Sequence, residues 1–224
     1  MPLLSVIIPV YNEAKTIKQV LEKVNSVPID KEIIIVDDGS TDGTQNILGD
    51  IKCDNLKIIY HSSNRGKGAA ILTGLSHATG EYVVVQDADF EYNPDDYLKL
   101  MDAIQNKGAD IVLGARFTKG YNGMLIPKAG NRILTTLFNI LFGVKLNDSF
   151  TCYKFIRKES FIDLSLKSNS FDIEIEILAK AIKKGMRIVE IPVSYTPRTY
   201  AEGKKIKIKD GIWAIIRICR FRFY

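Results

Sequence analysis

Hydrophobic and polar positions follow a repeating order along residues 1–115: a short apolar run, a polar turn, then an amphipathic stretch. The apolar runs are continuous, which is typical of strands buried on both faces of a parallel sheet. The stretches between them place apolar side chains at helical spacing, as at Ile17, Val20, Leu21 and Val24. This order predicts strands at 3–10, 32–36, 56–60, 81–86 and 110–114, with helices between them. The predicted fold is α/β, with a mostly parallel central sheet and helices on both faces.

The second half of the chain has a different pattern. Residues 125–144 predict an amphipathic helix that is too polar to cross a bilayer, since Lys128 and Arg132 interrupt it. It would lie in a membrane interface or pack on its own sheet, and periodicity by itself favours packing. A helix is predicted at 171–184 and a strand at 187–195. Residues 212–224 mix apolar, aromatic and basic side chains, which fits either a membrane-surface helix or a docked terminal helix.

Composition indicates an ordinary globular protein of one domain, or one domain with an extension: 224 residues, 46% hydrophobic and 25% charged. Cys53, Cys152 and Cys219 lie far apart, which argues against a disulfide framework and a zinc site. His61 and His77 are the only histidines and are expected on the surface. The first residues lack the basic region of a signal peptide, and no apolar run reaches ~18 residues. We therefore expect a reduced, cytosolic protein.

Positive charge is concentrated at the C-terminal end. Residues 198–224 contain eight Lys or Arg and two Asp or Glu, a net charge of +6, whereas the whole chain carries +5. The preceding residues therefore sum to −1. A basic tail on a near-neutral body suggests an anionic partner: ligand phosphates, an acidic membrane surface or nucleic acid.

Three carboxylates, Asp87, Asp89 and Glu91, follow the apolar run Val83–Val85 at alternate positions. In an extended segment such positions point the same way. Carboxylates on one side repel one another unless a cation lies among them, and hard divalent cations prefer oxygen ligands. The pattern predicts a metal site at the carboxyl end of a central strand, where open α/β sheets bind ligands. The alternative is a solvated acidic turn that caps the next helix, and spacing alone does not decide between them.

A glycine-rich piece, residues 64–68, begins the third predicted helix. It has neither the spacing of a Walker A loop nor the G-x-G-x-x-G of a dinucleotide site. The start of this helix could bind a phosphate through Gly66 and Gly68, with the cations Arg65 and Lys67 beside it. A tight turn with solvated cations is at least as good an interpretation.

Eight motifs occur in order along the chain: SVIIPVYNE at 5–13, IVDDGSTDG at 35–43, NRGKG at 64–68, QDAD at 86–89, GAR at 114–116, DSFTCYK at 148–154, EIPVSY at 190–195, and the basic segment 198–205. Together they resemble the inverting glycosyltransferases of family 2, which have a GT-A fold. The later motifs resemble the dolichyl-phosphate mannosyltransferase branch and its polyprenyl-phosphate glycosyltransferase relatives. The resemblance covers nearly the whole chain.

This resemblance implies a GT-A domain at 1–197, with 198–224 forming a basic acceptor-side loop and an amphipathic helix packed on or extending from it. It implies inverting, metal-dependent transfer of a hexose from a nucleotide sugar of the GDP-mannose or UDP-glucose type. The acceptor would be a polyprenyl or dolichyl phosphate at the membrane surface, and the cofactor Mg²⁺ or Mn²⁺. The protein would be cytoplasmic and peripheral at the cytoplasmic face, held there directly or by a membrane-anchoring partner.

The resemblance also implies the site residues. Nucleotide-sugar binding would fall to Pro9, Tyr11, Glu13, Val36, Asp38, Asp87, Ala88, Asp89, Arg116, Arg198 and Lys204. The metal would lie among Asp87, Asp89 and Glu91, and Arg116, Arg198 and Lys204 would face the phosphates of donor and acceptor. The candidate catalytic residues are Asp89, Arg116 and Asp148.

Chemistry bears on the choice of acceptor. A sugar hydroxyl generally needs a carboxylate base within hydrogen-bond reach. A lipid monophosphate, with a second pKa of about 6, needs cations instead. Asp148 is the candidate base, although a structural or positioning function comes first. In a hydroxyl-acceptor enzyme, Asp148→Asn should abolish chemistry and leave donor binding intact.

Some features depart from the family pattern or suggest other classes of protein. Glu91 stands where many members have Gln, and the chain stops at Tyr224 where many relatives continue into transmembrane helices. Lipid access would then depend on 125–144, on 212–224 or on a membrane partner. A non-catalytic nucleotide-sugar-binding protein is disfavoured by the complete set of carboxylates and cations. A nucleic-acid partner is not expected, because no recognition motif accompanies the basic tail.

Overall fold

The computed structural model describes residues 1–117, 125–198 and 208–223, and within them a seven-stranded sheet. Its strand order is β3-β2-β1-β4-β6-β5-β7. All pairings are parallel except the two made by β6, which confirms the predicted mostly parallel sheet. The strands are β1 (Leu4–Val10), β2 (Lys31–Asp37), β3 (Leu56–Tyr60), β4 (Tyr82–Val85), β5 (Ile111–Ala115), β6 (Lys154–Arg157) and β7 (Ile188–Pro192).

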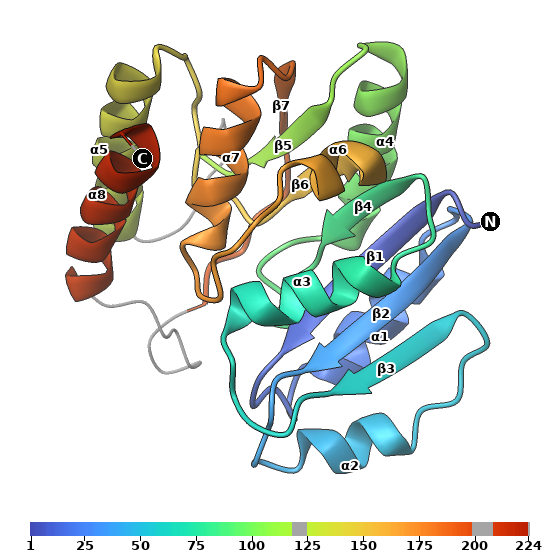
Figure 1. Cartoon of the computed structure of the whole chain (residues 1–224). Coiled ribbons are helices and arrows are strands. Elements are labelled where there is room, and N and C mark those ends of the chain that lie inside the picture. The colour runs from blue at the N-terminus through green and yellow to red at the C-terminus, as the bar shows by residue number, and fades with distance from the viewer. Residues whose placement is uncertain (118–124, 199–207, 224) are drawn as a thin grey trace.

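Helices lie on both faces of this sheet. In Figure 1, α3 lies in front of the sheet, while α1 and α4 lie behind it. At one end of the sheet α8 packs against both α5 and α7. The helices are α1 (Ile17–Ser26), α2 (Thr44–Gly49), α3 (Lys67–His77), α4 (Tyr97–Asn106, after the 3₁₀ turn Pro94–Asp96), α5 (Leu125–Phe142), α6 (Lys158–Asp163), α7 (Ile173–Lys183) and α8 (Ile208–Phe223).

The antiparallel strand β6 has no counterpart among the predicted strands. Its four residues place only Phe155 and Ile156 between two cations, which is too short an apolar run to indicate a strand. Both neighbours of β6 are distant in sequence, since it pairs with β4 on one side and β5 on the other. Tertiary pairing, not local pattern, therefore forms this strand.

The parallel strands bring their polar endings to one edge of the sheet. Val10 at the end of β1 pairs with Asp37 at the end of β2, and Ile7 pairs with Val85 at the end of β4. Further along, Ala115 at the end of β5 pairs with Pro192. The segments that follow these strands contain most of the candidate residues, so one edge of the sheet collects them.

The C-terminal helix α8 is docked on the same body as the sheet. Ile218 is fully buried, and Arg217 forms a 3.3 Å ion pair with Asp172 at the start of α7. On its outer side Ile212, Trp213 and Phe223 are 60%, 59% and 70% exposed. Among the helices in the described ranges, none is both long and apolar enough to cross a bilayer.

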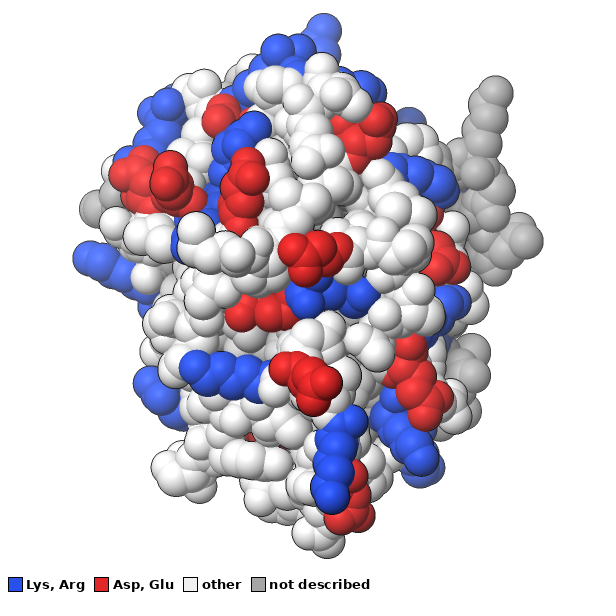
Figure 2. Space-filling model, turned by 90° about the vertical axis from the view of Figure 1, so that its right-hand side faces the viewer, with Lys and Arg blue, Asp and Glu red and all other residues white. Residues whose placement is uncertain are grey.

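Charges of both signs are interspersed on the face that lies to the right in Figure 1. Figure 2 shows that Lys and Arg alternate with Asp and Glu across this face. Exposed ion pairs contribute ~0–1 kcal/mol each, so such a mixture of charges is an ordinary solvated surface.

Candidate active site

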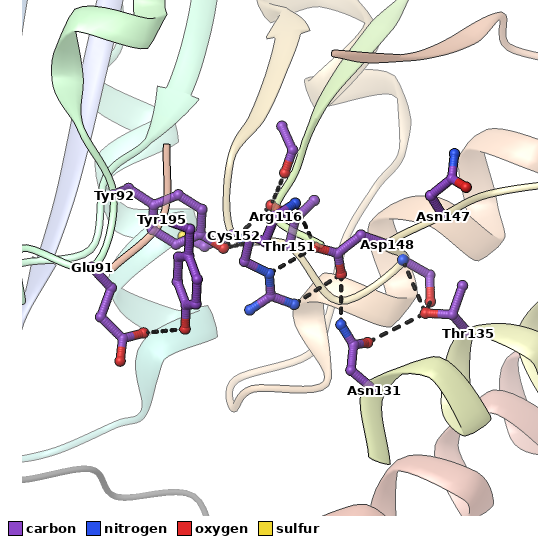
Figure 3. Close-up of polar contacts among 12 residues, drawn as sticks. Glu91, Tyr92, Arg116, Asn131, Thr135, Asn147, Asp148, Thr151, Cys152 and Tyr195 are labelled. Atoms are coloured by element: carbon purple, nitrogen blue, oxygen red, sulfur yellow. Dashed lines mark hydrogen bonds and ion pairs between the residues drawn. The ribbon is translucent and has the colours of Figure 1, made fainter. Parts of the chain in front are cut away.

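The three carboxylates that follow β4 each contact a side chain or backbone group from another segment. Asp87 Oδ1 lies 2.7 Å from Nζ of Lys67, and Asp89 Oδ2 lies 2.7 Å from Nη2 of Arg198. Glu91 accepts hydrogen bonds from the Tyr195 hydroxyl at 2.7 Å and from the Arg198 backbone N–H at 2.9 Å. Figure 3 shows the Glu91–Tyr195 contact. The segment after β7 therefore closes over the segment after β4.

Arg198 links two of the predicted donor-binding residues. Its guanidinium lies 2.7 Å from Asp89 and 3.3 Å from Glu13, which follows β1. Burial raises the pKa of Asp89 to about 7, and the neighbouring charges of Asp87 and Glu91 add to this, although Arg198 opposes it. Glu13 and Asp89 therefore share one guanidinium in this part of the site.

The arrangement of these carboxylates bears on the predicted metal. Within the described ranges no three His, Cys, Asp or Glu side chains are arranged as a ready cluster for a metal ion. The chemistry of the donors nevertheless fits a hard divalent cation, because Asp87, Asp89 and Glu91 all offer carboxylate oxygens. Arg198 holds Asp89 in the arrangement described, so it would have to release this carboxylate for an ion to bind.

Arg116, which follows β5, forms a two-pronged ion pair with Asp148 (Figure 3). The Nε–Oδ2 distance is 2.7 Å and the Nη2–Oδ1 distance is 2.8 Å, and Asn131 of α5 donates to Oδ1 at 2.8 Å. Burial alone would raise the pKa of Asp148, but the charge and hydrogen bonds of Arg116 outweigh it and the pKa is lowered. The Arg116 guanidinium also lies over the Tyr195 ring, 5.2 Å from its centroid.

Asp38 organises the loop before α3. Its carboxylate accepts from the backbone N–H of Arg65 at 2.9 Å and of Gly66 at 2.7 Å. His61 Nδ1 lies 2.7 Å from the same carboxylate. His61 is only 7% exposed, so the prediction that it lies on the surface was wrong: Asp38 and Thr73 hold its ring inside the fold.

The remaining residues that were predicted to bind the nucleotide sugar differ in how far they are exposed. Tyr11 is 38% exposed, whereas Val36 is fully buried. Ala88 is 4% exposed, and its carbonyl accepts a 2.6 Å hydrogen bond from Thr16. Pro9 lies within β1, one residue before its end. Lys204 lies outside the described residues.

The glycine-rich piece approaches another loop of the chain. A Cβ at Gly66 would lie 2.2 Å from the carbonyl oxygen of Asn169, and one at Gly68 would lie 2.2 Å from that of Ser168. Gly66 also has a φ of +97°, which favours glycine. The glycines therefore allow close packing of the 168–169 backbone. Lys67 is neither solvated nor turned to an open phosphate position, because its ammonium contacts Asp87 and Glu174.

Some residues of this region were given no function by the sequence. Glu174 lies in the first turn of α7 and is buried, although charged residues within helices are usually solvated. Tyr195 and Lys154 occur within the family-like motifs, but spacing alone does not indicate their contacts. In the sequence, two acids alternate with isoleucines in the stretch Ile173–Ile177. This alternation is the feature that could have indicated a buried Glu174.

Comparison with known sequences gives a consistent family. The model of glycosyl transferase family 2 matches residues 5–165. The polyprenol monophosphomannose synthase of Mycolicibacterium smegmatis is 31% identical over 215 residues, covering 89% of this chain and 79% of that protein. The glycosyltransferase AglJ of Haloferax volcanii is 30% identical over 210 residues, covering 92% and 67%. The dolichol-phosphate mannosyltransferase of Pyrococcus furiosus is 30% identical over 210 residues, covering 89% of this chain and 58% of its own length.

Solved structures share the fold. Glucosyl-3-phosphoglycerate synthase from Mycobacterium tuberculosis, in complex with Mn²⁺, UDP and phosphoglyceric acid, has a TM-score of 0.75 at 19% identity, covering 99% of this chain and 79% of that one. S. aureus TarS in complex with UDP-GlcNAc has a TM-score of 0.67 at 23% identity, covering 97% and 66%.

Proposed function

Because this chain belongs to glycosyl transferase family 2, we propose that it transfers a hexose from a nucleotide sugar to a polyprenyl phosphate, with inversion at the sugar carbon. The donor is of the GDP-mannose or UDP-glucose type. The relatives named polyprenol monophosphomannose synthase and dolichol-phosphate mannosyltransferase support a lipid-phosphate acceptor.

The observation that carries this proposal is the environment of Asp148. Its side chain is fully buried, and its two oxygens accept hydrogen bonds from Arg116 and Asn131. A base for a hydroxyl acceptor must come within hydrogen-bond reach of that hydroxyl and take its proton. An enclosed carboxylate whose pKa Arg116 holds low is poorly suited to this. A phosphate acceptor is already anionic near neutral pH and needs no base.

The proposed reaction is a direct displacement. An oxygen of the acceptor phosphate attacks the anomeric carbon from the face opposite the donor diphosphate. The bond from that carbon to the diphosphate oxygen breaks, and the nucleoside diphosphate leaves with the electron pair. No proton has to be removed. Arg116, held by Asp148, and Arg198 and Lys204 from the basic segment would bind the anionic groups at the edge of the sheet.

We also propose that Asp87, Asp89 and Glu91 hold Mg²⁺ or Mn²⁺. When bound, such an ion would neutralise charge that grows on the leaving diphosphate. Arg198 would then exchange its ion pair with Asp89 for contact with donor phosphate. Residues 1–197 would form the catalytic domain, and 198–224 the acceptor-side segment.

The proposed membrane contact is peripheral, at the cytoplasmic face, and uses α8. Ile212, Ile216 and Phe223 recur at helical spacing and are 60%, 48% and 70% exposed. Arg220 and Arg222 fall on either side of this apolar stripe by the same spacing. An exposed apolar stripe flanked by cations fits an anionic bilayer surface. A membrane-anchoring partner is the other way to reach the lipid.

The test is transfer from radiolabelled GDP-mannose and UDP-glucose, in parallel, to a short polyprenyl phosphate with Mg²⁺ or Mn²⁺. The matched control acceptor is the corresponding polyprenol, which has a hydroxyl in place of the phosphate. We expect label in the organic phase with the phosphate only, and its loss with EDTA.

Other outcomes would change the proposal. Label on a hydroxyl acceptor, abolished by Asp148→Asn with donor binding intact, would make Asp148 a base and overturn the lipid-phosphate acceptor. Donor binding without transfer to any acceptor would indicate a nucleotide-sugar-binding protein.

A further inference from the structure

Four ionic side chains form a continuous chain that leads from the partly exposed Asp87 to the buried Lys154. Lys67 Nζ lies 2.7 Å from Asp87 Oδ1 and 3.2 Å from Glu174 Oε1. The other oxygen of Glu174 lies 2.5 Å from Nζ of Lys154, which also donates to the carbonyl of Thr151. The charges alternate from negative to positive along the chain and sum to zero.

This chain of charges is not explained by local stability. Lys67 is the first residue of α3, and a cation at a helix N-terminus is unfavourable. The Lys67 side chain is 13% exposed and that of Lys154 is 1% exposed, and charges are rarely buried unless paired.

Because Glu174 lies beside Lys67, the ammonium is attracted by two carboxylates, those of Asp87 and Glu174. Its Oε1 atom is buried and has no hydrogen-bond partner within the described part of the chain, so it acts on Lys67 through charge. Its Oε2 atom is fixed from behind by Lys154. Without the negative charge of Glu174, Lys67 would neutralise Asp87 alone.

We propose that Glu174 is a positioning residue for the metal site, acting through Lys67. By balancing the Lys67 charge it leaves Asp87 negative enough to attract a divalent cation. The inference rests on the metal binding that the proposed function assigns to Asp87, Asp89 and Glu91, and it is independent of the acceptor. It assigns a function to a side chain of α7 that is not part of the carboxylate motif itself.

The experiment compares Glu174→Gln with Glu176→Gln. Both residues lie in the first turn of α7, and they are 7% and 2% exposed. Glu176, however, pairs with Lys180 and accepts from the backbone N–H of Lys167 and Ser168. Mn²⁺ binding is measured directly, from the electron paramagnetic resonance signal of the free ion, with UDP or GDP present. Chemical unfolding is followed for each variant.

We expect Glu174→Gln to weaken Mn²⁺ binding about 10-fold, as removal of outer-shell partners typically does. Glu176→Gln should leave Mn²⁺ binding within about twofold, even if it lowers the free energy of unfolding. The double exchange Lys67→Met/Glu174→Gln removes the competing cation as well, so it should recover much of the lost affinity. Glu174→Asp, which keeps the charge, should bind Mn²⁺ more tightly than Glu174→Gln.

The outcomes separate this inference from the proposed function. If the unaltered protein binds Mn²⁺ and folded Glu174→Gln binds it equally well, the inference is wrong and the proposed function stands. The inference is also wrong if the double exchange binds Mn²⁺ no better than Glu174→Gln. If the unaltered protein does not bind Mn²⁺, both the metal part of the proposed function and this inference fail.

Discussion

Arg116 and Asp148 meet side-on, with two N–O contacts of 2.7 and 2.8 Å and a third hydrogen bond from the Arg116 backbone N–H at 3.1 Å. Asp148 comes from the segment before β6 and Arg116 directly follows β5, so the pair joins two parts of the chain 32 residues apart. Bidentate pairs of this kind fix the plane of the guanidinium.

Asp148→Asn leaves the Arg116 guanidinium buried without its anion. Breaking a buried pair in this way destabilises proteins by ~3–5 kcal/mol. We therefore expect the free energy of unfolding, measured with urea at neutral pH, to fall by about 3 kcal/mol. Asp163→Asn is the control, because its pair with Lys184 is exposed and should contribute less than about 1 kcal/mol.

The same pair predicts part of the acid sensitivity. The folded pKa of Asp148 lies below its ordinary value of 3.8, so the folded state binds fewer protons there than the unfolded state. The stabilisation is present above pH 3.8 and is lost as the pH falls through the folded pKa. Asp148→Asn should therefore lose stability less steeply than the unaltered protein below pH 3.8. If the stability of the two proteins falls equally steeply with pH, the lowered folded pKa of Asp148 is contradicted.

Arg198→Ala removes the cation that lies between Glu13 and Asp89. Mn²⁺ binding without nucleotide should become tighter, since the guanidinium no longer competes for Asp89. Transfer should fall about 100-fold, because a group that stabilises charge in the transition state is lost. Electron paramagnetic resonance and single-turnover transfer check the two effects. Weaker binding of Mn²⁺ would show that Arg198 supports the ion rather than competing with it.

Gly68→Ala tests the packing explanation of the glycine-rich piece. The new Cβ would press on the backbone of Ser168, so we expect a loss of ~1–3 kcal/mol in the free energy of unfolding. Gly130→Ala is the matched control, since nothing lies within 4 Å of its Cβ position in α5. That change should stabilise the helix by ~0.5–1 kcal/mol. Similar effects at the two positions would contradict the packing argument.

Charge reversal on α8 tests the proposed membrane surface. Arg220→Glu/Arg222→Glu should weaken co-sedimentation with vesicles that contain phosphatidylglycerol by at least about tenfold, at ~1 kcal/mol for each basic residue removed. Vesicles of phosphatidylcholine alone should be little affected. Lys18→Glu/Lys23→Glu makes the same charge change on the exposed side of α1 and should have a much smaller effect. Equal loss in both variants would indicate a general charge effect.

The sequence by itself determined the parallel part of the sheet and the approximate ends of its strands, except for the strand predicted at 187–195, which ends at Pro192. Apolar runs such as Ile33–Val36 and Val83–Val85 are local, continuous and bounded by polar turns, and each lies in a strand of the structure. Because parallel strands end at the same edge, the same pattern also brought Glu13, Asp38 and the Asp87–Glu91 carboxylates to one side. The ordered motifs added the family, which the comparison confirmed.

Only the tertiary structure decided which groups these side chains meet. Three contacts join segments that are distant in sequence. They are the pairing of β6 with β4, the contact of the buried His61 with Asp38, and the contact of Lys67 with Glu174. A periodic pattern reports whether a position is buried or exposed, but it does not identify the partner of a charge. Lys67 and Glu174 look like ordinary surface charges until packing removes them from water, and then the energy of an unpaired buried charge requires that they meet.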